Sequence, residues 1–459
     1  MRPLPPPANI TLINRRILNL RFSVCDMSSV VMTTDKPNLK TEAIAGITTF
    51  FTMAYIVVVN PQIISADGKT GMAFSGVLTA TVIICFTMTL LMGLYAKLPF
   101  AVAPGMGINA FFTYTIILGK GVPWPTALGI IFWAGVFFLL ISVTPIRESI
   151  AKAIPREIRI AAACGIGVFL TFIGLKNAGF IVADPVTFVK IGSLGKPALL
   201  TIVGVAVSIF LMSRKNPFAF LVTIVLITLI AWAVGSVTAP PKVFSLPDFK
   251  SVFLKLDVIG ALKLSLLPSI IAILFTDLFD SISTFIGVTH AGDLLDEEGH
   301  PKNLRQGLIV DSLATVGAGL AGTSSGTAYI ESVAGIQMGG RTGMTSVFTA
   351  LCFLPCFFIA PLAGMVPAYA TAAVLILVGA AMFRSVGQIN FGKIEEGVPA
   401  FLTLILIPLT FSITQGILWG FISHVGLYLM VGRRRDIHPV MYVLAIVSVG
   451  LLVLERITA

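Results

Sequence analysis

Long apolar runs separated by short polar breaks fill the chain from residue 43 to its last residues. The runs are about 15 to 25 residues long and lack the alternation of a half-buried strand, which favours membrane-spanning helices. A transmembrane barrel would need roughly ten-residue alternating segments, and the sequence holds none. Seven runs precede a polar stretch, seven follow it, and a further run ends the chain. They lie near residues 43–64, 74–94, 101–118, 125–144, 157–175, 198–212, 216–236, 264–288, 304–321, 328–340, 342–363, 367–383, 397–412, 413–431 and 438–455.

The composition narrows the class of protein. Hydrophobic residues make up 56% and charged residues 11% of the 459 positions. Soluble domains carry about 25% charged residues, so this chain has too few to cover its surface in water. Inside a bilayer every backbone N–H and C=O group needs an internal partner, which a helix provides. We therefore predict an all-α polytopic membrane protein with about 14 transmembrane segments.

The net charge of +10 is concentrated beside apolar runs rather than in a separate basic domain. One loop holds Arg147, Lys152, Arg156 and Arg159, and Arg433 begins an arginine triplet after the fourteenth run. Such clusters mark cytoplasmic ends by the positive-inside rule. They predict a multi-pass protein of the plasma (inner) membrane with a cytoplasmic N-terminus. They do not indicate a nucleic-acid partner.

An odd number of segments in each half has a topological consequence. The second half begins on the opposite side of the membrane, so the halves are predicted to be inverted repeats. The third and tenth runs both contain glycine-rich breaks, "APGMGINAFFTY" at 103–114 and "GTSSGTAYIESVAGIQMGG" at 322–340. Non-helical backbone at this depth is tolerated where it lines a cavity or is buried in protein. The predicted parts are a disordered cytoplasmic tail at 1–42, a first repeat at 43–236, an extracytoplasmic linker at 237–263, a second repeat at 264–431 and a basic, apolar tail at 432–459.

Two carboxylates, Asp277 and Asp280, lie in the eighth run within "FTDLFDSISTF". Residues three apart share one face of a helix. An acid at the bilayer centre costs about 2.5 to 3.5 kcal/mol on insertion scales, which disfavours a lipid-facing position. The pair is therefore predicted to face a substrate or a proton path. The alternative is a structural role, with hydrogen bonds to nearby backbone or to hydroxyls such as that of Ser281.

A third acid, Glu331, follows the break in the tenth run and is predicted to lie in the first turn of a helix. There the helix dipole and the free N–H groups of Ala328, Tyr329 and Ile330 would surround it. A carboxylate beside backbone donors suits a planar heterocycle with N–H and C=O groups on its edge. Asn109 holds the matching place in the third run, where its amide would read a base edge or tie two helices together.

Other polar residues in the runs are predicted to be structural. Asp311 in the ninth run would pair with hydroxyls across helices, and His424 in the fourteenth would be packed and hydrogen-bonded. Cys352 and Cys356 are four residues apart, but no histidine or thiol cluster joins them. The sequence therefore predicts neither a metal site nor a cofactor. It leaves open whether the run at 438–455 crosses the membrane or lies against it.

Several long stretches resemble the AzgA-like purine permeases, a branch of the nucleobase–cation symporters that also include uracil and xanthine permeases. The likeness runs from about residue 41 to the end of the chain. It is carried by "TEAIAGITTFFTMAYIVVVNPQIIS" (41–65), "APGMGINAFFTY" (103–114), "FTDLFDSISTFIGV" (275–288), "DSLATVGAGLAGTSSGTAYIESVAGIQMGGRTG" (311–343) and "GILWGFISHVGLYLM" (416–430).

This resemblance implies a core domain of segments one to four and eight to eleven, and a gate domain of the others. Segments three and ten would each be a short strand followed by a half-helix. Asp277 and Glu331 would bind the purine, Asn109 and Asp280 would assist, and the backbone from Ala328 to Ile330 would read the base edge. Proton coupling would run through Asp277 and Asp280. Their spacing of three is similar to the AzgA-like branch, whereas uracil and xanthine permeases often carry a glutamate at the position of Asp277.

The prediction is thus a proton-coupled purine nucleobase importer that works by alternating access and is not an enzyme. Guanine and hypoxanthine rank first as substrates, with adenine close behind. Its partners would be a purine nucleobase, protons and the lipid bilayer. Homodimers are common among the proteins it resembles, and nothing in these residues requires one.

Two other functions fit the sequence less well. An anion exchanger on the same inverted-repeat fold would rely on helix dipoles and basic groups, whereas acids surround the predicted pocket here. A membrane-embedded aspartyl protease would need two aspartates on different helices facing one another. Asp277 and Asp280 lie on one helix within a single turn, which disfavours that reaction.

Overall fold

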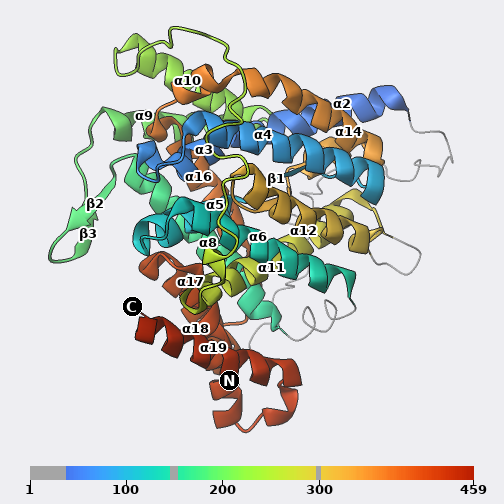
Figure 1. The fold of residues 1–459 in the computed structure, drawn as a ribbon, viewed down its shortest axis with the longest axis vertical. Helices are drawn as coiled ribbons and strands as arrows, with labels where there is room; N and C mark the ends of the chain where they lie inside the picture. The colour runs from blue at the N-terminus through green and yellow to red at the C-terminus, as the bar shows by residue number, and fades with distance from the viewer. Residues whose placement is uncertain (1–37, 145–153, 296–300, 459) are drawn as a thin grey trace, which may run out of the picture. The chain divides into compact units, whose positions relative to one another are not determined.

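The computed structural model describes residues 38–144, 154–295 and 301–458. Most of the predicted tail, together with Arg147 and Lys152 of the basic loop, lies outside the described residues. From Leu39 onward the chain forms one compact helical unit. The predicted polytopic helical architecture is confirmed (Figure 1).

Most predicted runs correspond to one helix each, with bounds that differ by a few residues at most ends. The helices of the first half are α2 (Leu39–Met53), α3 (Ile56–Ser65), α4 (Phe74–Leu91), α5 (Met106–Ala110), α6 (Trp124–Val143), α8 (Arg156–Asn177), α9 (Lys196–Ser213) and α10 (Ala219–Ala233). Those of the second half are α11 (Leu267–Gly292), α12 (Leu304–Ala321), α13 (Ser332–Gln337), α14 (Gly343–Phe353), α15 (Ala360–Gly364), α16 (Ala368–Phe383), α17 (Ile394–Thr410), α18 (Ile413–Met430) and α19 (Pro439–Thr458).

Within the described residues, eight helices are long and apolar enough to cross a membrane, and four more apolar helices are shorter. The count of 14 segments and the boundaries of the two repeats therefore stay predictions. The shorter helices include α19, so the course of the last run also stays open.

The helices pack in two groups. In the first group, α12 packs against α4 and α6, α14 packs against α2 and α4, and α11 packs against α6 (Figure 1). In the second group, α16 packs against α8 and α9, while α17 packs against α8 and α18. These groups agree with the predicted core and gate domains. Contacts of α5 and α11 with α8, and of α11 with α18, join them.

The third and tenth runs are interrupted as predicted. Strand β1 (Val102–Pro104) precedes α5, and strand β4 (Gly326–Ala328) precedes α13. The two strands pair antiparallel, with Val102 opposite Ala328 and Pro104 opposite Gly326. Proline and glycine explain the breaks, because Pro104 lacks an N–H donor and Gly322 has a φ of +98° that other residues rarely adopt. A π-helical stretch, Phe111–Gly119, continues α5.

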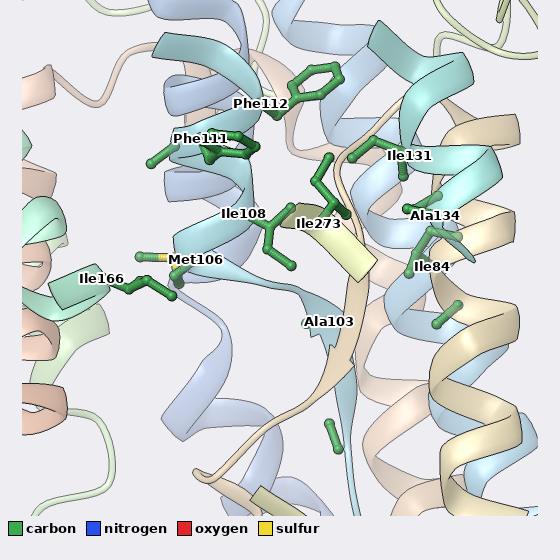
Figure 2. Close-up of a cluster of buried hydrophobic side chains, with 14 of the residues drawn as sticks. Ile84, Ala103, Met106, Ile108, Phe111, Phe112, Ile131, Ala134, Ile166 and Ile273 are labelled. Atoms are coloured by element: carbon green, nitrogen blue, oxygen red, sulfur yellow. The ribbon is translucent and has the colours of Figure 1, made fainter. Parts of the chain in front are cut away.

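Apolar side chains fix these elements against their neighbours. Figure 2 shows Met106 of α5 beside Ile166 of α8, while Ile108 on another side of α5 points toward Ile273 of α11. Helices α5 and α8 are closely packed at this contact. A Cβ atom placed on Gly107 would lie 2.4 Å from Cγ2 of Ile166, so only glycine fits without movement. Helix α5 therefore bridges the two packing groups at close range.

Two features modify the predicted all-α picture. Strands β2 (Ile181–Asp184) and β3 (Phe188–Ile191) form a hairpin between α8 and α9 that the sequence reasoning did not anticipate. The second feature is that the predicted linker at 237–263 is attached to the helices by hydrogen bonds. The Asp248 carboxylate accepts a hydrogen bond from the Ser75 hydroxyl at 2.8 Å, and the Trp133 indole N–H donates to the Val258 carbonyl at 2.9 Å. The linker is thereby attached to α4 and α6.

Candidate functional site

The two paired strands place a helix start on each side of one crossing point. Beyond β1, the Gly105 N–H donates to the Ser325 carbonyl at 2.9 Å, and beyond β4 the Tyr329 N–H donates to the Ala101 carbonyl at 2.9 Å. The Tyr329 hydroxyl donates to the Pro104 carbonyl at 2.6 Å. These bonds hold α5 and α13 at fixed positions relative to one another.

Asp277 lies on the side of α11 that faces the protein interior. Its side chain is 1% exposed, and its Oδ2 atom accepts a hydrogen bond from the Thr315 hydroxyl of α12. Asp311, on the same helix as Thr315, is also fully buried and accepts from the Ala328 N–H at 3.1 Å. The Oδ1 atoms of both aspartates lack a partner among the described residues. Asp277 thus belongs to a buried polar network between α11, α12 and β4.

Asp280, one turn further along α11, borders a cavity of about 40 Å³ between the two packing groups. The cavity is lined among others by Gly107, Arg159, Ile166, Thr276, Asp280 and Ser283. At roughly 10–15 Å³ for each water, it has room for about three waters and not for a nucleobase.

Several polar atoms around this cavity have no partner among the described residues. They include Oγ1 of Thr276 and Nε of Arg159, both buried. Within the same residues the Asp280 carboxylate makes neither an ion pair nor a hydrogen bond, and Arg159 lines the same cavity. Buried polar groups are usually hydrogen-bonded, so unpartnered ones around a cavity are suited to a ligand.

Glu331 lies at the residue just before α13, close to the predicted first turn. Its Oε1 atom accepts a hydrogen bond from the Tyr55 hydroxyl at 2.8 Å. The N–H groups of Ala328 and Tyr329 already donate to protein acceptors. The Ile330 side chain is 60% exposed, and in the described part of the chain its N–H has no acceptor.

Asn109 is fully buried and ties helices together. Its Nδ2 atom donates to Oδ1 of Asn60 at 3.0 Å, and Asn60 in turn donates to the hydroxyls of Thr81 at 2.7 Å and Thr323 at 2.8 Å. Oδ1 of Asn109 has no partner among the described residues. The amide network therefore joins α3, α4 and α5 to the break before β4.

The structure brings Asp280 and the backbone next to Asn109 to the cavity, but Asp277 and Glu331 are not among the lining residues. Sequence reasoning missed Tyr55, Asn60 and Thr315, although an amide beside a proline inside an apolar run was a signal for Asn60. Arg159 was assigned to a basic loop. It belongs instead to the first turns of α8, because that helix already begins at Arg156.

The fold and this site define a class. The molecule is a polytopic helical membrane protein in which two interrupted segments cross beside a cavity between two groups of helices, as in secondary transporters. The chain belongs to the permease family, whose family model matches residues 40–418.

Individual relatives support this assignment. Adenine permease AdeP of Escherichia coli is 43% identical over 89% of this chain and 92% of its own length. Guanine/hypoxanthine permease PbuO of Bacillus subtilis is 38% identical over 89% of this chain and 96% of its own length. The transmembrane domain of the cyanobacterium bicarbonate transporter BicA has a similar fold, with a TM-score of 0.62 at 18% identity over 84% of this chain and 98% of that domain.

Proposed function

We propose that this protein imports purine nucleobases across the plasma (inner) membrane, coupled to protons, by alternating access. Membership of the permease family and relatives named for adenine and for guanine and hypoxanthine support the substrate class. Guanine, hypoxanthine and adenine are all candidate substrates, since relatives named for each are similar to this chain.

The observation that carries the proposal is the set of unpartnered polar groups at the cavity. The Asp280 carboxylate would accept from a ring N–H or an exocyclic amine, and the Arg159 guanidinium would donate to O6 and N7 of an oxopurine. The Thr276 hydroxyl could donate or accept a hydrogen bond. Phe279, beside them, offers a flat apolar face for stacking. Since the cavity is smaller than a purine, the two groups of helices must separate to admit one.

The acids also suit proton coupling. Among the described residues, Asp277, Asp280 and Glu331 form no ion pair with a cation, and such groups inside a membrane protein commonly mark a proton path. We assign the purine contact to Asp280. Glu331 at the start of α13, together with its hydrogen-bond partner Tyr55 just before α3, would complete the site. Asp277, behind Asp280 in the buried network, would hold the proton.

The test is uptake of labelled hypoxanthine, guanine, adenine and uracil by purine-transport-deficient cells that express the chain, with and without a protonophore. We expect uptake of at least one purine, no uptake of uracil, and loss of uptake with the protonophore. Absence of purine uptake while the protein is present in the membrane would contradict the proposal. Purine uptake that resists the protonophore would contradict the coupling alone.

The anion exchanger is the second candidate, because BicA has the same fold. That likeness extends to the fold only, and Asp280 at the cavity would repel an anion. A parallel uptake assay with labelled sulfate and bicarbonate separates the two functions. Anion uptake without purine uptake would favour the exchanger.

A further inference from the structure

The hairpin β2–β3 plays no part in the site described above. Its strands pair antiparallel with Ile181 opposite Ile191 and Asp184 opposite Phe188. It begins four residues after the last residue of α8 and ends five residues before α9. Figure 1 shows the two strands as an arm beside these helices. Strands of four residues are only about 13 Å long, so the hairpin stays near the end of two helices that are able to span the membrane.

The two faces of the hairpin differ in chemistry. Side chains alternate between the faces, and the register places Ile181, Ala183, Val189 and Ile191 together on an entirely apolar face. The opposite face carries Val182 and Phe188 together with an ion pair between Lys190 Nζ and an Asp184 carboxylate oxygen at 2.9 Å.

The apolar face is largely uncovered. Ile191 is 76% and Val189 45% exposed, and the strand that carries them is exposed throughout. A two-stranded hairpin is marginally stable in water, and packing on an apolar surface is what normally stabilises one. Exposure of such a face to water would be unfavourable.

The turn is built to present an apolar tip. Asp184 accepts hydrogen bonds from the N–H groups of Val186 at 2.9 Å and Thr187 at 3.0 Å, so polar backbone of the turn is already satisfied. Phe188 has a φ of +64°, a left-handed conformation that is unusual for a bulky residue and that glycine would adopt freely. Its side chain is 84% exposed.

Exposed apolar surface continues from the hairpin into α9. Leu194 in the connection is 57% exposed and Leu199 in the first turn of α9 is 52% exposed. Only 22% of the apolar stretch of α9 is buried inside the protein, as expected for a helix that faces lipid. The hairpin therefore adjoins an exposed apolar surface that a bilayer would cover.

We propose that the β2–β3 hairpin lies on the lipid surface, with Ile181, Ala183, Val189 and Ile191 in the headgroup region at the end of α8 and α9. Interfacial elements of this kind bury their apolar side about 5–10 Å into the boundary between headgroups and acyl chains. The Asp184–Lys190 pair stays on the side that faces water.

The test compares Val189 and Val182, two valines of similar exposure on opposite faces. Each is replaced by cysteine in the full chain after the five native cysteines are changed to serine, and each is spin-labelled in lipid nanodiscs. Accessibility to oxygen and to a water-soluble nickel chelate then reports the surroundings of the label. We expect the ratio of oxygen to nickel accessibility to be several-fold higher at Val189→Cys than at Val182→Cys. Purine uptake by both variants controls for folding.

Equal, water-like ratios at both positions would overturn the proposal. Strong dipolar broadening at Val189→Cys would also overturn it, because a second copy of the chain would then cover the face. If the cysteine-free protein fails to fold, Val189→Trp and Val182→Trp in the native background give the same contrast. Brominated lipids should then quench added fluorescence at Val189→Trp, and equal quenching of both variants would overturn the proposal.

Discussion

The two aspartates of α11 lie one turn apart and have different surroundings. Asp277 accepts a hydrogen bond from Thr315 inside a buried network, whereas Asp280 borders a cavity with Thr276 and Arg159 and has no partner among the described residues. Asp277 is tied into the buried network, where it would hold a proton, whereas the unpartnered Asp280 beside the cavity is available to a ligand. The spacing of the pair alone predicted one shared role for both aspartates. Their different surroundings favour a separate role for each.

The largest expected effect is at Asp280. Asp280→Asn removes the charge that would accept from the purine, and a charge-assisted hydrogen bond contributes about 3 kcal/mol, or about 100-fold in uptake. The measurement is initial uptake of the preferred purine at equal amounts of protein in the membrane. Asp67→Asn, in a loop outside the site, is the matched control and should leave uptake unchanged. Uptake by Asp280→Asn within threefold of the parent would remove Asp280 from the site.

A pair of threonines tests the same contrast through stability. Thr315→Val leaves the buried Asp277 carboxylate without its donor and should lower the free energy of unfolding by about 2 kcal/mol. Thr276→Val removes a hydroxyl that has no protein partner and should change stability by less than about 0.5 kcal/mol while lowering uptake. Thermal unfolding in lipid nanodiscs measures both. Equal destabilisation by the two variants would mean that the hydroxyl bonded to Asp277 and the hydroxyl at the cavity contribute equally to stability.

Arg159 extends the comparison across the cavity to α8. Arg159→Gln loses the charged donor and should raise KM for an oxopurine about tenfold. Arg156→Gln, three residues earlier, is the matched control. Arg156 hydrogen-bonds the Gln388 side chain at 3.0 Å and does not line the cavity, so its replacement should leave KM unchanged. A similar change in KM for both variants would indicate a general effect of charge at this end of α8.

A smaller change in substrate binding is expected at Asp277. Asp277→Asn keeps the shape of the side chain, so KM should stay within about threefold of the parent. Protonophore sensitivity and the dependence of uptake on pH should be lost, because this group would hold the proton. A rise in KM as large as that of Asp280→Asn would show that Asp277 contacts the purine itself, as the family resemblance implies. Unchanged uptake and unchanged pH dependence would exclude both roles.

The sequence predicts the helices of this protein well for a physical reason. Bilayer thickness and backbone hydrogen bonding leave an apolar run few alternatives to a helix. The ninth run, predicted at 304–321, forms α12 (Leu304–Ala321). Proline and glycine in the third and tenth runs likewise predicted where the helices are interrupted. The strands before α5 and α13 were predicted from the family resemblance and not from the pattern of residues.

The contacts of the site are harder to predict because they join positions far apart in the chain. Asn60 and Asn109 are 49 residues apart, and Asp277 and Thr315 are 38 apart. No local pattern specifies which of two neighbouring acids meets a hydroxyl and which meets a cavity. The hairpin was missed for another reason, since strands of four residues are too short to stand out beside long apolar runs.

The smallest effect is expected at Asp184 in the hairpin, which provides a control for pH. Hydrogen bonding from the Thr187 N–H, together with Lys190, lowers the pKa of Asp184 to about 2. The unfolded value is about 3.9, so the contribution of this group to stability is complete above about pH 4 and is lost as the pH falls toward 2. Between pH 5 and 8 it binds no proton, and Asp184→Asn should leave the pH profile of uptake unchanged. A shifted profile would show that groups outside α11 contribute to the titration, and would weaken the assignment of proton coupling to its two aspartates.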